Sequence, residues 1–230
     1  MIVSSRHNNP RYAAGQKAVE KLAETGTPWK EEALIIGFTG AIASGKSTVA
    51  DYLETKGAAL VDGDVISREL VQPGKPVFNE IVKQFGPQMV GPDGRLDRKK
   101  LGQEVFGNEE SLLKLNEITH PHIWEEMTRQ TLAAALNTDV VLIVMPLLLE
   151  HGAEQLVDQV WVTDVSEETQ LKRLMTRDKS SREQAIGRIN AQMSAAEKRV
   201  LADVLIDNNG TLEETFANAD NAWQEHVLTV

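Results

Sequence analysis

Residues 40–47 carry the clearest chemical pattern in the chain. They read Gly-Ala-Ile-Ala-Ser-Gly-Lys-Ser and match G-x-x-x-x-G-K-[ST], a phosphate-binding loop. Successive backbone N–H groups in such a loop curl into a nest at a helix N-terminus, where the helix dipole favours phosphate oxygens. The pattern predicts an ATP site lined by Gly40, Ala41, Ala43, Ser44, Gly45, Lys46, Ser47 and Thr48.

Three side chains at the end of this loop have distinct expected roles. We expect Lys46 to reach the β- and γ-phosphates and to act in catalysis. The hydroxyl of Ser47 is expected to ligate Mg²⁺, and Thr48 lies one step further along the cradle. The alternative, a chance glycine-rich turn, is disfavoured because the loop stands between an expected strand and an expected helix.

Two aspartates, Asp62 and Asp64, follow the second apolar run of the chain. Ligands of an open α/β sheet bind at the carboxyl ends of the strands, so both carboxylates are expected beside the loop. Asp64 is the expected catalytic base for a hydroxyl acceptor, and Asp62 is expected to orient Mg²⁺ through its water shell. The alternative is that either aspartate caps the helix starting near Val65.

Hydrophobic runs and turn residues indicate an α/β fold. A strand, a helix at 46–56 and a second strand form a βαβ unit with parallel strands, and 65–137 and 166–199 are helical. We therefore expect a five-stranded parallel sheet of the phosphate-loop kinase type, flanked by helices. Its strands are expected at 34–38, 58–61, 140–145, 160–163 and 204–206.

Several residues mark where these elements begin and end. Gly57 closes the first helix and residues 91–94 form a turn. The sequence also contains helix-start signals, of which 180–183 and 194–197 are capping boxes. These signals lie at Pro76, Asp97, Pro121, 180–183, 194–197 and Thr211.

Composition limits the class of protein. The 230 residues suit one domain with insertions, and the absence of cysteine excludes disulfides and thiolate chemistry. A net charge of −10 argues against binding nucleic acid through general phosphate neutralisation, so the expected partners are small molecules. The longest apolar run, 140–149, contains Pro146 and is too short for a membrane span.

Residues 1–33 lack a secretory hydrophobic region, because charged residues interrupt the apolar ones. We expect a surface helix with loose ends there, no export, no membrane association and a cytoplasmic location. The expected assembly is a monomer or a small homo-oligomer.

Read together, the motifs of residues 34–228 resemble the dephospho-coenzyme A kinase family. The phosphate loop is common to many families, whereas the combination of D-x-D-x-I-x-R, L-D-R, H-P and P-L-L-x-E is far more specific. These motifs and the weaker matches lie at 37–48, 61–68, 96–98, 120–121, 146–150, 170–173, 177–178, 192, 202–203 and 207–208.

The resemblance implies transfer of the ATP γ-phosphate to the ribose 3′-hydroxyl of dephospho-coenzyme A, the last step of coenzyme A biosynthesis, with ATP and Mg²⁺. It also implies a nucleotide-binding core at 34–64, 139–165 and 200–230, a helical substrate lobe at 65–138 and a lid at 166–199. The first 33 residues have no counterpart in the family.

Carried over to this chain, the family pattern implies that Asp64 is the base and that Arg68 contacts the acceptor. It places Asp97, Arg98, His120 and Pro121 in the substrate lobe, and Arg173 and Arg177 as lid arginines that bind nucleotide, Arg173 also acting in catalysis. Without the resemblance, a solvated helix face paired to Asp178 or Glu167 would be the favoured interpretation of the two arginines, and His120 would suit a helix start.

The loop departs from the family pattern, because Ala41 and Ala43 replace two glycines. We expect the loop to keep its fold, since alanine is tolerated where φ is negative.

Two other functions stay open. One is a kinase of the same core that acts on nucleoside monophosphates. The other is a nucleotide-gated switch, which is disfavoured because the chain has no N-K-x-D signature and because Pro146, and no aspartate, follows the apolar run.

Overall fold

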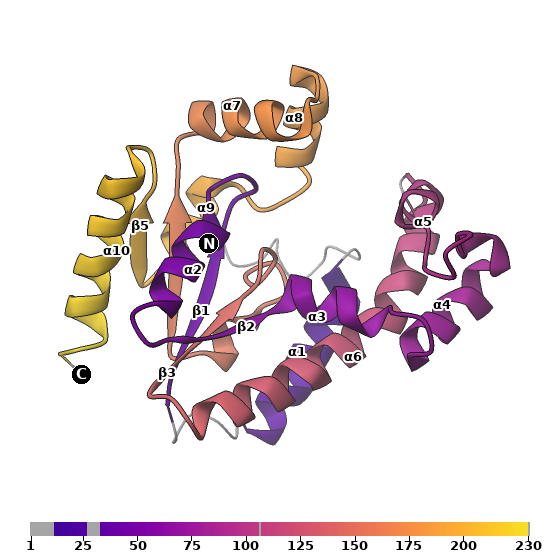
Figure 1. Ribbon diagram of the computed structural model, residues 1–230, viewed down its shortest axis with the longest axis horizontal. Helices are drawn as coiled ribbons and strands as arrows, with labels where there is room; N and C mark the ends of the chain where they lie inside the picture. The colour runs from indigo at the N-terminus through magenta and orange to yellow at the C-terminus, as the bar shows by residue number, and fades with distance from the viewer. Residues whose placement is uncertain (1–11, 27–32, 106, 230) are drawn as a thin grey trace. The chain divides into compact units, whose positions relative to one another are not determined.

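The computed structural model describes residues 12–26, 33–105 and 107–229 (Figure 1). The chain divides into two compact units. One consists of Met1–Gly26 with Asp62–Gln130, and the other of Thr27–Val61 with Thr131–Val230. We call them the helical unit and the sheet unit, and describe each by itself.

The sheet unit is built on five strands in the order β2-β3-β1-β4-β5. β1 is central and runs parallel to β3 on one side and β4 on the other, and β5 is parallel to β4. β3 is buried at every position, as expected of a strand covered on both faces. The strands are β1 (Leu34–Gly40), β2 (Ala59–Asp62), β3 (Val140–Val144), β4 (Gln159–Asp164) and β5 (Val204–Asp207). The predicted strands and the predicted fold class are confirmed.

Two helices help to cover this sheet. Residues of α2 (Lys46–Glu54) and α10 (Leu212–His226) join strand residues in one buried cluster, in which Phe38 and Trp161 are fully buried. Tyr52 of α2 stacks on Phe216 of α10 with 4.0 Å between ring centroids. Burial of such large apolar side chains, at about 1.5–3 kcal/mol each, holds the helices on the sheet.

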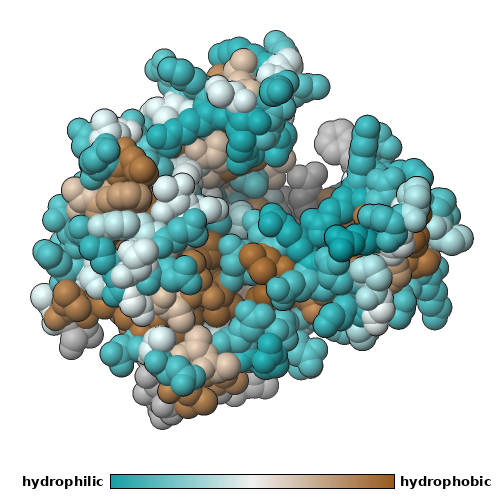
Figure 2. All heavy atoms as spheres, in the orientation of Figure 1, coloured by the Kyte–Doolittle hydropathy of each residue, from teal (hydrophilic) through white to brown (hydrophobic). Residues whose placement is uncertain are grey.

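The remaining helices of the sheet unit follow β3 and β4. A 3₁₀ helix, η4 (Ala153–Leu156), stands between these strands. After β4 come α7 (Glu167–Asp178), α8 (Arg182–Ile189) and α9 (Ala195–Leu201). We call α7 with α8 the arm. Figure 2 shows mainly hydrophilic residues over the arm, whereas α9 packs against β4.

The helical unit has its own core, formed by Val77, Ile81, Met89 and Leu101 with partly buried apolar neighbours. Its elements are α1 (Ala13–Thr25), α3 (Gly63–Leu70), α4 (Pro76–Phe85), η3 (Pro87–Met89), α5 (Arg98–Val105) and α6 (Glu109–Ala135), whose last turns belong to the sheet unit. Within the described residues, strand-like pairing here is limited to a bridge between Val90 and Leu96, beside the predicted turn at 91–94.

Most of the predicted helix starts are confirmed. Pro76 is the first residue of α4, Asp97 caps α5, and Ser194 and Thr211 form capping boxes at α9 and α10. Gly57 follows α2 with φ 110°, a conformation that favours glycine.

Two predicted starts are wrong. Pro121 lies inside α6, which continues through it, because the tertiary packing of this 27-residue helix outweighs one missing backbone hydrogen bond. The capping box of α8 is built by Ser181 with Gln184, one residue later than expected, because α8 begins at Arg182.

The surface helix expected near the start of the chain corresponds to α1. Its Val19 is fully buried, so one face of the helix is packed. The loose ends expected on either side fall largely at residues 1–11 and 27–32, outside the described residues. No helix in the described part of the chain is long and apolar enough to cross a membrane.

Candidate functional site

The predicted phosphate loop connects the end of β1 to the start of α2 in the sheet unit. Gly45 is the N-cap of α2 and has φ 84°, in the left-handed region. Lys46, Ser47 and Thr48 therefore form the first turn of α2, where backbone N–H groups lack partners within the helix. The strand, loop and helix provide the geometry in which the amides at a helix start can bind phosphate.

A hydrogen-bond network connects the phosphate loop to β4. The hydroxyl of Ser44, buried to 1% exposure, contacts the Thr163 hydroxyl of β4 at 2.7 Å, and Ser44 N–H donates to the Ala41 carbonyl. A Cβ on Gly40 would collide with the hydroxyls of both Ser44 and Thr163. The loop thus follows this path only with glycine at position 40.

Asn208 is a loop contact that the sequence analysis missed. Its buried side chain donates from Nδ2 to the Ser44 carbonyl at 2.6 Å and accepts from the Thr215 hydroxyl at 2.7 Å. A Cβ on Gly45 would collide with this amide, so Asn208 and Gly45 fit only together. Residues 207–210 read as an ordinary turn in sequence, and only the partial match of 207–208 to the family pointed to them.

The expectation for Ala43 is wrong in one respect. Ala43 has φ 62°, whereas tolerance of alanine was expected from a negative φ. A side chain in this left-handed region costs about 1–2 kcal/mol. Ala41 does not share this conformation, and it is buried, with 7% exposure. The loop keeps its path, but with strain at the position where the family pattern has glycine.

Of the two arginines expected in a lid, Arg173 lies at the phosphate loop. Its Nη1 stands 3.8 Å from the point where a Cβ on Gly45 would be. Arg177 hydrogen bonds to Asp178 at 2.8 and 3.1 Å, and Arg188 also contacts that carboxylate. The Arg177 hydrogen bond is the main reason why the pKa of Asp178 is lowered to about 2. The structure therefore brings Arg173, but not a free Arg177, to the phosphate loop.

Asp62 and Asp64 belong to the helical unit, at the start of α3. Asp62 caps this helix, with its Oδ1 accepting from the N–H groups of Asp64 at 2.7 Å and Val65 at 3.1 Å. Of the two aspartates, either of which was expected to be able to cap this helix, Asp62 makes the cap, because α3 begins at Gly63. Asp64 keeps an exposed carboxylate in the first turn, and exposed Arg68 stands one turn further along.

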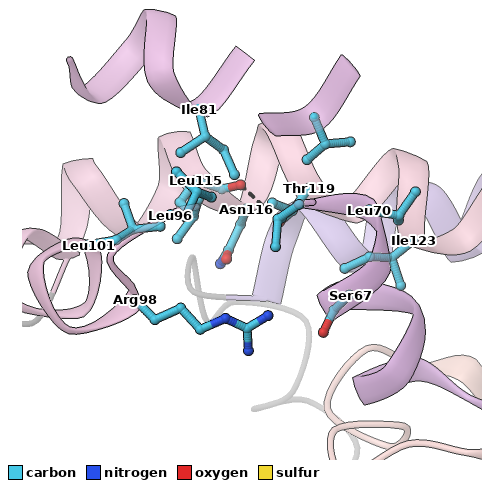
Figure 3. A pocket seen from close by; sticks show the side chains of 12 residues that line it. Ser67, Leu70, Ile81, Leu96, Arg98, Leu101, Leu115, Asn116, Thr119 and Ile123 are labelled. Carbon is cyan, nitrogen blue, oxygen red and sulfur yellow. Dashed lines mark hydrogen bonds between the residues drawn. The ribbon is translucent and has the colours of Figure 1, made fainter. Parts of the chain in front are cut away.

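The helical unit contains a pocket of about 220 Å³. Figure 3 shows the apolar side chains of Ile81, Leu96 and Leu115 on one side of it, and polar groups of Arg98, Asn116 and Ser67 on the other. Twelve residues line the pocket: Ser67, Leu70, Val71, Val77, Ile81, Leu96, Arg98, Leu101, Leu115, Asn116, Thr119 and Ile123.

The other residues expected to bind the acceptor either line this pocket or are neighbours in sequence of residues that line it. Arg98 lines it directly, and Asp97 fixes the start of α5 by accepting from the N–H groups of Lys99 and Lys100. His120 and Pro121 lie in α6, next to Thr119 of the pocket wall. Burial lowers the pKa of His120 to about 4, so its imidazole is neutral at physiological pH.

Comparisons with known proteins agree with the motifs. A sequence model of the family described as dephospho-CoA kinase matches residues 34–214. The chain belongs to the dephospho-CoA kinase family. A dephospho-CoA kinase of Carboxydothermus hydrogenoformans is 45% identical over 197 residues, which cover 85% of this chain and 92% of that protein. The corresponding enzyme of Symbiobacterium thermophilum is 47% identical over 191 residues, 83% of this chain and 80% of that protein.

Two solved structures are similar to this chain. The crystal structure of TT1252 from Thermus thermophilus has a TM-score of 0.74 and 32% identity, covering 85% of this chain and 98% of that one. The dephospho-CoA kinase of Campylobacter jejuni has a TM-score of 0.59 and 28% identity, covering 84% and 96%.

The strain at Ala43 leads to a first prediction. Ala43→Gly should raise the free energy of unfolding by up to about 1 kcal/mol, because the relieved strain outweighs the extra freedom of glycine in the unfolded chain. Ala41→Gly is the matched control and should lower it by about 0.5–1 kcal/mol, since no strain is relieved there. Urea unfolding at 25 °C measures both, and equal effects of the two substitutions would show that the strain is absent.

Burial of His120 leads to a second prediction. Between pH 6.5 and 4 the unfolded chain binds a proton that the folded imidazole does not, so folded stability is lost as pH falls through this window. The contribution is on the order of 3 kcal/mol at pH 4 relative to pH 7. His120→Asn should lose correspondingly less stability over the same range in urea unfolding at pH 7, 5.5 and 4. Parallel losses in both proteins would contradict a buried neutral His120.

Proposed function

We propose that this protein transfers the γ-phosphate of ATP to the ribose 3′-hydroxyl of dephospho-coenzyme A, giving coenzyme A and ADP in the last step of coenzyme A biosynthesis. The observation that carries the proposal is the family match over 34–214, which includes both the phosphate loop and Asp64.

The nucleotide side of the proposed reaction belongs to the sheet unit. The loop from Gly40 to Thr48 cradles the phosphates through its amides, and Lys46 neutralises charge on the β- and γ-phosphates. Arg173 is proposed to stabilise the charge of the transferring phosphoryl group, because its guanidinium already lies near Gly45. Arg177 is proposed to join it by exchanging its bond to Asp178 for a phosphate oxygen.

The proposed chemical step is an in-line displacement. A bond forms between the ribose 3′-oxygen and the γ-phosphorus, and the bond from that phosphorus to the β–γ bridging oxygen breaks, so ADP leaves. Asp64 accepts the proton of the 3′-hydroxyl, a role that suits its exposed carboxylate in the first turn of α3. Arg68, one helical turn away, is proposed to bind an anionic group of the acceptor.

The residues at the loop also suit Mg²⁺. The exposed hydroxyl of Ser47 at the start of α2 is a hard oxygen ligand, and Mg²⁺ commonly uses few protein ligands beside phosphate oxygens and water. Asp62 is proposed to act through its Oδ2 on a coordinated water, since Oδ1 accepts the two N–H groups at the start of α3. The cation would supply charge neutralisation on the β- and γ-phosphates.

The helical unit is proposed to hold the acceptor. The pocket combines apolar walls with the guanidinium of Arg98 and the amide of Asn116. This lining suits an acceptor whose chain carries methyl groups and amides beside a diphosphate. Asp97 would act by fixing the start of α5, and His120 and Pro121 by shaping α6 beside the pocket. We therefore propose that 65–138 is a substrate lobe, 166–199 a lid, and 34–64, 139–165 and 200–230 the nucleotide-binding core.

We also propose that the enzyme works in the cytoplasm on small molecules alone, as a monomer or small homo-oligomer. The net charge of −10 supports the absence of a nucleic-acid partner.

The acceptor specificity is the direct test. ADP release with dephospho-coenzyme A should exceed release with AMP, CMP or UMP by on the order of 100-fold in kcat/KM, because the small acceptors leave the pocket empty. AMP is the informative control, since it shares the adenosine of dephospho-coenzyme A but lacks the chain that carries methyl groups and amides. Preference for any of the monophosphates would identify the chain as a nucleoside monophosphate kinase and reject this proposal.

The role of Asp64 gives a further prediction. Asp64→Asn should lower kcat by about 100-fold or more while leaving the Kd for ATP within about twofold, since the proton acceptor is lost and the cradle is kept. Lys46→Ala is the contrast, because its charge contacts the nucleotide before and during transfer, so ATP affinity and kcat should fall together. Calorimetric titration and steady-state rates would separate the two patterns; equal loss of binding and turnover in Asp64→Asn would contradict its role as the base.

A further inference from the structure

A buried ion pair in the sheet unit has no part in the mechanism above. The Lys198 ammonium, on α9, has a side-chain exposure of 0%, and the Glu150 carboxylate has 2%. Lys198 donates to Glu150 Oε2 at 2.8 Å and Oε1 at 2.9 Å, and to the Pro146 carbonyl at 3.2 Å. Both ends of the P-L-L-x-E motif, Pro146 and Glu150, thus bind one ammonium.

The residues of this cluster also form hydrogen bonds with two other segments of the chain. Glu150 Oε1 also accepts the backbone N–H of Met193 at 3.0 Å, in the segment between the arm and α9. The Pro146 carbonyl also accepts from the Thr39 hydroxyl at 3.1 Å, and Thr39 directly precedes Gly40 at the start of the phosphate loop. The pair therefore connects the base of the arm to the strand that carries the loop.

The neighbouring residue of α9 makes a second connection. Arg199 Nε donates to Asp164 Oδ2 at 2.7 Å, at the end of β4. The preceding residue of that strand, Thr163, contacts Ser44 of the loop. Since β3 and β4 flank β1, α9 is joined to the chain on both sides of the strand that leads into the cradle.

Stability alone does not account for a buried ion pair. Removing two charges from water costs several kcal/mol, and well-packed apolar residues of similar volume usually stabilise as well or better. Burial accordingly lowers the pKa of Lys198, despite the opposing effect of Glu150. What apolar residues cannot supply is a set of directional bonds to Met193 and Pro146 that fixes these two segments relative to each other.

We infer that Lys198 and Glu150 are positioning residues for phosphoryl transfer: they fix α9, and with it the arm that carries Arg173, relative to the phosphate loop. The inference rests on the proposed function, because it assigns a kinetic role in that reaction. Arg173 acts on the transferring group, and a displacement of about 1 Å at such a group costs on the order of 100-fold in rate.

The test is a double-mutant cycle in kcat. Glu150→Leu combined with Lys198→Met should unfold at a temperature close to that of the wild type, and should lower kcat about 10- to 100-fold with little change in the KM for dephospho-coenzyme A. Added to Arg173→Ala, the same pair should cause little further loss, because it acts through Arg173. A purely structural pair would multiply its effect with that of Arg173→Ala.

The ion pair of Lys56 with Asp220 provides a matched control. Its N–O distance is 2.7 Å and its side chains are 34% and 39% exposed. Lys56 lies in the turn after α2 and Asp220 on α10, in the same unit. Lys56→Met with Asp220→Leu should leave kcat unchanged. If the variant with Glu150→Leu and Lys198→Met does not fold, Glu150→Gln, which keeps the shape of the side chain, is carried through the same cycle with the same expectation.

The outcomes separate the two proposals. A wild-type protein that does not phosphorylate dephospho-coenzyme A rejects the proposed function and the inference with it. An active wild type with multiplicative losses in the cycle, or with an unchanged kcat in the Glu150→Leu, Lys198→Met variant, overturns the positioning role alone. No effect of Arg173→Ala overturns the positioning role and the role proposed for Arg173, while the proposed reaction stands.

Discussion

The site depends on one steric constraint, the close approach of the Asn208 amide to Gly45 beneath the phosphate loop. Asn208 donates a hydrogen bond to the Ser44 carbonyl. For that contact to form, Gly45 must have a left-handed backbone conformation and no side chain. With the carbonyl turned inward, the amides that follow are available at the start of α2. The carboxyl end of β5 thereby shapes a cradle that is formed some 160 residues earlier in the sequence.

This constraint explains how an acidic protein can bind polyphosphates. The chain has a net charge of −10, so its overall field repels anions. A cradle of fixed amide dipoles does not depend on that field, and it needs only a few cations aimed at the same point. Lys46 lies in the first turn of α2, and Arg173, on α7 of the same unit, has its guanidinium near Gly45.

The sequence predicted the features that depend on local pattern. Buried strands read as apolar runs, and the phosphate loop reads as glycines and a lysine at fixed spacing, because each needs particular residue types at adjacent positions. Asp97 and Thr211 were found for the same reason, since a cap involves only residues within one turn. Asn208 was missed because its partner in the loop, Ser44, is distant in sequence and its own turn has an ordinary turn composition. Pro121 was misread because packing over a long helix outweighs the local preference of proline.

Ala43 and the Lys198–Glu150 pair illustrate a second limit of the sequence. Neither a backbone angle nor the burial of a charge can be read from residue types, yet each changes what a residue contributes to the structure. At Ala43 the left-handed backbone converts a tolerated substitution into local strain beside the phosphates, at a position where rigid amides matter most. At Lys198 complete burial converts an ordinary helix lysine into a charge that is stable only with all three of its oxygen partners in place. The hydrogen bonds of the pair and of Pro146 join segments next to the cradle, and a preorganised cradle is what catalysis by electrostatic stabilisation requires.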